Sequence, residues 1–165
     1  MELIPEIEAL IYDRTGADVV YADGLAERVK LNGISSLSPA EQSEWFGGLR
    51  GRYTITDLNR VETAVQALSD VLRTYGYTAT VATKTTWDYP DIPSPAEMSR
   101  YLGNVETLVR ASFVLPTTPE LPPDMEHLTF GGANDIERVL FDIWSLISSV
   151  SDAFIYSGEI HSGEF

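Results

Sequence analysis

Two long stretches of the chain carry apolar residues at helical spacing. The first covers 56–75, where the apolar positions are Leu58, Val61, Val65, Leu68, Val71, Leu72 and Tyr75. The second covers 129–154, where they are Ile136, Val139, Leu140, Ile143, Leu146, Ile147, Val150 and Phe154, with Trp144 beside them. Intervals of three and four residues place each set on one side of a helix. Both stretches therefore predict long amphipathic helices that bury one face.

Two further helices are indicated by an identical start signal, Ser-Pro-Ala-Glu, at 38–41 and at 94–97. In each, the serine caps the helix, the proline suits the first helical position and the glutamate closes a capping box. Weaker patterns predict a helix over 14–31 and a short helix or docking arm over 1–13. We therefore expect a mainly α protein built as a bundle of about five helices.

The hydrophobic pattern changes its period at 77–87 (YTATVATKTTW), where apolar and polar residues alternate. Alternation with many β-branched and aromatic residues predicts a β-strand. A strand needs partners for its backbone N–H and C=O groups, and the candidates are the C-terminal tail 155–165, residues 1–12 or another subunit. We expect a small β element made by 77–87 and the tail, and we interpret the missing partner as a sign of assembly.

The domain organisation follows from one proline-rich stretch. Residues 114–125 hold four prolines and are predicted to form an extended strap that crosses the surface of the bundle. We expect one helical domain over 1–154, containing the strand and the strap, followed by an extended tail over 155–165.

Charge narrows the classes of partner. The chain has 11 basic and 25 acidic residues, a net charge of −14, which disfavours binding to nucleic acid and to anionic membranes. The section 114–165 holds nine acids and one base, Arg138. It is either a solvated face or a surface for a basic partner, such as the region of Arg50, Arg52 and Arg60. No apolar run is long enough to span a bilayer, and the acidic N-terminus predicts no secretory signal.

The sequence offers little for catalysis. It has no cysteine, no phosphate-binding loop and no nucleophile motif, and neither His127 nor His161 has a partner at metal-ligand spacing. We therefore expect no enzyme, no cofactor and no metal site. Carboxylate pairs suited to a cell-wall hydrolase arise by chance among so many acids. Stacking on sugars is the alternative to core packing for Trp45, Trp87 and Trp144.

An asparagine followed by a glutamate recurs on three predicted helices. The pairs are Asn59 with Glu62, Asn104 with Glu106, and Asn134 with Glu137. They either form a buried polar network that fixes the packing of the helices or lie on solvated surface.

An ordered series of short phrases spans nearly all of the chain after residue 12. It includes DRT at 13–15, LRG at 49–51, DLNRVE at 57–62, DIP at 91–93, RYL at 100–102, YSGEI at 156–160 and SGE at 162–164. In this series the chain resembles an uncharacterised family of phage and prophage proteins from Gram-positive bacteria, encoded among tail and other virion genes.

The resemblance implies a virion structural role in the tail region, after assembly in the bacterial cytoplasm, and it implies no catalytic residues. We expect a tail or baseplate subunit that forms homo-oligomers and packs against other virion proteins. The expected contact residues are Tyr156, Ile160, Phe165, Val81 and Trp87. The alternatives are a receptor- or glycan-binding module at the virion tip, a cell-wall hydrolase, and a regulator that binds basic proteins through its acidic face.

Overall fold

The structure is a computed structural model that describes residues 2–89 and 91–158, with side chains as far as Ala153. The described residues form six α-helices and one 3-10 helix. In chain order these are α1 (Pro5–Glu8), α2 (Gly16–Asn32), η1 (Ile34–Ser36), α3 (Pro39–Gly47), α4 (Ile55–Thr74), α5 (Pro95–Ala111) and α6 (Phe130–Gly158). The prediction of a mainly helical protein is confirmed.

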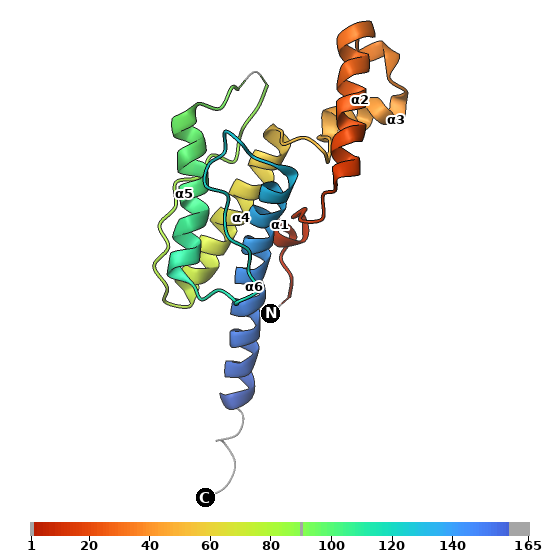
Figure 1. Ribbon diagram of the computed structural model, residues 1–165. Helices are drawn as coiled ribbons and strands as arrows, with labels where there is room; N and C mark the ends of the chain where they lie inside the picture. The colour runs from red at the N-terminus through yellow and green to blue at the C-terminus, as the bar shows by residue number, and fades with distance from the viewer. Residues whose placement is uncertain (1, 90, 159–165) are drawn as a thin grey trace, which may run out of the picture.

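The bundle consists of α4, α5 and α6, with the short α1 against α4 and α6 (Figure 1). Its core contains the apolar stripes that define these helices in the sequence, including Val61, Leu68, Val105, Leu108, Ile136, Leu140 and Ile143, all fully buried. Each helix contributes one apolar face, so the three faces close around a common core.

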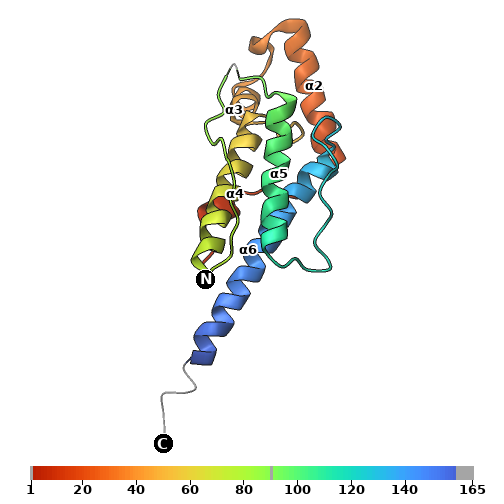
Figure 2. The same cartoon turned by 90° about the vertical axis from the view of Figure 1, so that its left-hand side faces the viewer.

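The helices α2 and α3 lie outside this bundle. Together with η1 they form a separate unit over residues 16–49, which we call the head, at one end of the molecule (Figures 1 and 2). The head has a small core of its own made by Ala22, Leu25, Leu37 and Leu49, with Val29 and Trp45 packed against it. The expected bundle of about five helices is therefore three long helices with α1, and two of the predicted helices build the head.

The helix boundaries follow the capping signals. Ser38 and Ser94 both form the predicted capping boxes, with Glu41 and Glu97 respectively. A third box is formed by Thr54 with Asp57, so α4 begins just before the predicted start. Glycines also lie at the ends of α2 and α4, where Gly33 and Gly76 adopt positive φ angles of 78° and 83° that favour glycine.

The described residues contain no β-strand, so the strand predicted over 77–87 is not confirmed. The stretch runs instead as extended chain alongside α4 and α5 (Figures 1 and 2). Its alternation is real, because Ala79 is buried and Val81 packs partly buried against the bundle core. The physical reason for the missing strand is that side chains from two helices, described below, occupy the place of a neighbouring strand.

The end of the chain also differs from the expectation. Helix α6 continues to Gly158, so 155–158 are helical rather than part of an extended tail, and 159–165 lie outside the described residues. The last turns of α6 project beyond the bundle, at the end of the molecule opposite the head (Figures 1 and 2).

The irregular chain between α5 and α6 crosses the bundle surface, as predicted for the strap. Leu121, Met125 and Leu128 fasten it to the core by packing partly buried against it. Among the described helices, none is both long and apolar enough to cross a membrane.

Candidate interaction sites

The extended segment 79–87 is held to the bundle by side-chain amides. Asn104 on α5 donates to the Ala82 carbonyl at 2.9 Å and accepts the Ala82 N–H at 3.1 Å. Asn59 on α4 does the same for Trp87, with distances of 2.8 and 2.7 Å. Each amide thus makes the two bonds that a residue on a neighbouring strand would make. We call these two contacts the asparagine clamps.

A third asparagine acts in the same way elsewhere. Asn134 on α6 donates to the Arg14 carbonyl at 2.9 Å and accepts the Arg14 N–H at 3.0 Å. The repeated asparagine–glutamate pairs therefore do form polar contacts that position irregular chain on the helices. Glu106 is the exception, because it forms an exposed ion pair with Arg110 on the same helix.

The buried carboxylate of Glu62 supports the segment between the two clamps. Arg100 binds it through two bonds of 2.8 and 2.7 Å, and the Trp87 indole N–H donates to it at 3.2 Å. The Lys84 backbone N–H donates to the same carboxylate. Glu62 is only 1 % exposed, so its charge depends on these donors for compensation. The cluster joins α4, α5 and the segment.

A second buried charge cluster lies where the chain enters and leaves the head. Glu137 on α6 accepts from Arg14 at 2.6 Å and from Arg60 at 2.8 and 2.9 Å. Asp57 accepts from the same two guanidinium groups. Two arginines and two carboxylates balance one another in formal charge. Burial acts to lower the pKa of Arg60, but the hydrogen bonds and negative charges of Glu137 and Asp57 together outweigh it, and the pKa is raised.

This cluster bears on the expectation that the acidic section 114–165 meets the region of Arg50, Arg52 and Arg60. Arg60 does meet the acidic C-terminal section, through Glu137. Arg50 and Arg52 do not, because they pair with Asp13 and Asp23 near the head. Beside the cluster, the hydroxyl groups of Tyr53 and Tyr101 share a short hydrogen bond. Burial raises the pKa of both tyrosines, so both phenols stay protonated at neutral pH.

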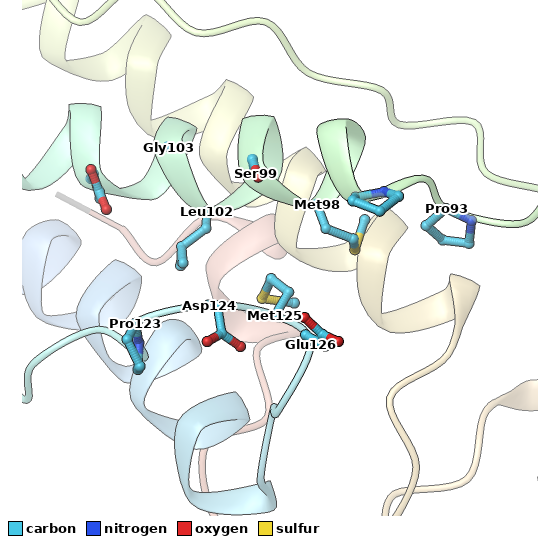
Figure 3. Close-up of a pocket in the computed structure, with 11 residues that line it drawn as sticks. Pro93, Met98, Ser99, Leu102, Gly103, Pro123, Asp124, Met125 and Glu126 are labelled. Carbon is cyan, nitrogen blue, oxygen red and sulfur yellow. The ribbon is translucent and has the colours of Figure 1, made fainter.

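A groove of about 570 Å³ separates α5 from the end of the strap (Figure 3). Met98 and Leu102 point into it from α5, and Met125 faces them from the strap. Carboxylates of Glu106, Asp124 and Glu126 line its sides, and all three belong to the acidic surface of the molecule. Such a lining suits an apolar side chain next to a basic group. Among the described residues, no group of His, Cys, Asp and Glu side chains is arranged to hold a metal ion.

The backbone of the extended segment is bound to the helices at some residues and not at others. Ala82 and Lys84 direct their N–H groups to the helices. No hydrogen bond joins the backbone N–H or C=O groups of Val81, Thr83 and Thr85 to another described residue. Successive residues of extended chain direct these groups to opposite sides, so within 81–85 the groups of these three residues lie on the side opposite to the bonded groups of Ala82 and Lys84.

The predicted contact residues fall into three groups. Trp87 is 3 % exposed and packs into the bundle core beneath Lys84. Val81 is partly buried on the same core. Tyr156 lies in the last turns of α6, where the structure describes the backbone alone, and Ile160 and Phe165 lie outside the described residues.

The tryptophans considered for sugar stacking belong to the two cores. Trp144 is 3 % exposed in the bundle, and Trp45 packs against the core of the head. Core packing therefore accounts for all three tryptophans, including Trp87.

Sequence reasoning missed the role of Arg14 and did not identify Glu137 as the partner of Arg60. Their partner Glu137 lies 123 and 77 residues further along the chain, and no local pattern connects such distant positions. The one available signal was the glutamate itself, at a position adjacent to the apolar stripe of α6, where an acid has to be paired.

Comparisons with protein-family models, with curated proteins and with solved structures give no match to this chain.

Proposed function

We propose that this protein is a non-catalytic assembly subunit of a phage or prophage particle, in the tail or baseplate region. It acts by binding copies of itself and neighbouring virion proteins. The ordered phrases described in the sequence support the placement in a particle, and the shape of the molecule supports the mode of action.

The observation that carries this proposal is the projecting end of α6. The Tyr75 hydroxyl donates to the Ser151 hydroxyl of α6 at 2.9 Å, near the end of the bundle. The helix continues from there to Gly158, past the end of the bundle (Figures 1 and 2). Short helices draw most of their stability in water from packing against other elements. A partner that packs against the projecting turns would supply such packing.

The distribution of the apolar surface supports the same role. Phe46 and Val20 in the head and Phe113 after α5 are each 74 % exposed, and Val150 near the end of α6 is 41 % exposed. The head and the projecting helix lie at opposite ends of the molecule. A subunit with contact surfaces at both ends is suited to bridging two neighbours.

Deletion of 155–165 tests the proposal. The shortened chain is expected to keep its helical circular dichroism, because the bundle core ends before the deletion, and to be absent from purified particles. A control chain with the same eleven residues in scrambled order separates chain length from specific contacts. Particles that contain the shortened chain at the normal copy number would contradict the assembly role.

A further inference from the structure

Over 81–85 the extended segment binds the helices through one side of its backbone, by the Ala82 N–H and C=O and the Lys84 N–H. The asparagine clamps bind the backbone groups of Ala82 and Trp87, and Glu62 accepts the backbone N–H of Lys84. Over 81–85 the engaged residues alternate with Val81, Thr83 and Thr85, whose backbone groups bond to no other described residue. This is the arrangement of an edge strand, and such an edge is a template for pairing with another chain.

The segment also carries no negative charge. Residues 77–87 contain one lysine and no acid, in a chain with a net charge of −14. Two copies of this protein repel one another over most of their surfaces, because like charges oppose association. Between two copies of this segment that repulsion is small. Its exposed side chains include Thr80, Thr85 and Thr86, and threonines pair well across strands.

We propose that two copies of this protein pair through their segments 81–85, side by side and antiparallel. The proposal rests on the assembly role and names the partner at one of its surfaces. The clamps hold the segment extended before the second copy arrives, so little backbone entropy remains to be lost on pairing.

Two-fold symmetry fixes the expected register. With the axis at Thr83, the two Thr83 residues exchange both backbone bonds, and Val81 exchanges both with Thr85 of the second copy. Ala82 then lies opposite Lys84 of the second copy in a non-hydrogen-bonded pair, with Cα atoms about 4.5 Å apart. That separation falls in the range that a disulfide bridges, about 4.4–6.8 Å.

Because the natural chain has no cysteine, single cysteines report this register directly. Ala82→Cys and Lys84→Cys proteins, one of them tagged, are mixed and oxidised mildly. We expect the disulfide between the two variants to form in greater yield than the disulfide between two copies of either variant. Thr78→Cys mixed with Lys84→Cys is the matched control, because in this register residue 78 lies about 13 Å from the position opposite Lys84. A mixed disulfide no more abundant than in the control overturns the proposal.

Amide hydrogen exchange tests the unmodified protein. At about 1 mM chain, the amides of Val81, Thr83 and Thr85 are expected to exchange at least about tenfold more slowly than in dilute solution. The amide of Ala82, already bonded to Asn104, is expected to change little. Exchange that is independent of concentration, with a monomeric mass at the higher concentration, overturns the pairing. Particle incorporation that still requires 155–165 would then leave the assembly role standing.

Discussion

The side-chain amide of Asn104 binds both backbone groups of Ala82, through bonds of 2.9 and 3.1 Å. In a sheet these two bonds come from a single residue of the adjacent strand. Here they come from the middle of a helix, and Asn59 repeats the arrangement at Trp87. A helical bundle can therefore hold an extended segment in place without a second strand.

Replacement of Asn104 by leucine should weaken the fold. Asn104 is 7 % exposed, and the leucine would leave the Ala82 N–H without its partner and the Ala82 carbonyl short of one. We expect the free energy of unfolding to fall by about 1–3 kcal/mol, measured by urea denaturation. Glu106→Leu on the same helix is the control and should change it by less than about 0.5 kcal/mol. If the two substitutions lowered the free energy of unfolding equally, the asparagine clamp would not be a source of stability.

Glu137→Gln should have a larger effect. The variant keeps the shape of the side chain but leaves two buried guanidinium groups, of Arg14 and Arg60, with Asp57 as their remaining carboxylate in the cluster. Breaking such a buried pair typically costs about 3–5 kcal/mol. Chemical denaturation measures the change, and Glu126→Gln on the exposed strap is the control. A loss as small as that of the control would mean that water compensates these charges.

Two glycine substitutions should act in opposite directions. A Cβ atom at Gly51 would lie 2.0 Å from the Asp18 carbonyl oxygen, so Gly51→Ala must push α2 away. A Cβ atom at Gly24, in the middle of α2, meets nothing within 4 Å. We expect Gly51→Ala to lower the melting temperature and Gly24→Ala to add about 0.5–1 kcal/mol. Thermal unfolding compares the two. An unchanged melting temperature for Gly51→Ala would contradict the close approach of the two backbones.

The head should lose stability in acid. Bonds from Arg28 and from Ser38 lower the pKa of Glu41 from 4.5 to about 2. Because the folded pKa lies below the unfolded one, the ionised carboxylate stabilises the head above about pH 4.5 and loses this effect as the pH falls towards 2. The Trp45 indole signal in NMR spectra follows unfolding of the head. Glu41→Gln is expected to flatten the pH dependence over this range, and an unchanged slope would contradict the assignment.

Much of the helical architecture follows from local patterns. The apolar stripe of α4 and the two serine boxes predict where helices form, because both act within a few residues of the chain. They do not say which stripes share a core. The small buried face of α2, Ala22 and Leu25, looks no different in sequence whether it packs in the bundle or in a separate head.

The extended segment shows a different limit. Alternation over 77–87 correctly predicts that Ala79 is buried and that the chain is extended. The pattern reports which side chains are covered and carries no information on what binds the backbone. Asn59 and Asn104 supply those bonds from helices that begin 22 residues before the segment and 8 residues after it. These asparagines come next to the extended segment only when the helices pack in three dimensions.

The charge cluster at Glu137 also governs how the head is carried. Arg14 lies just before α2, and Asp57 lies in the first turn of α4, so the cluster holds both connections to the head against α6. The cluster therefore fixes the two points at which the chain leaves the bundle for the head and returns from it, and so sets where the head is attached.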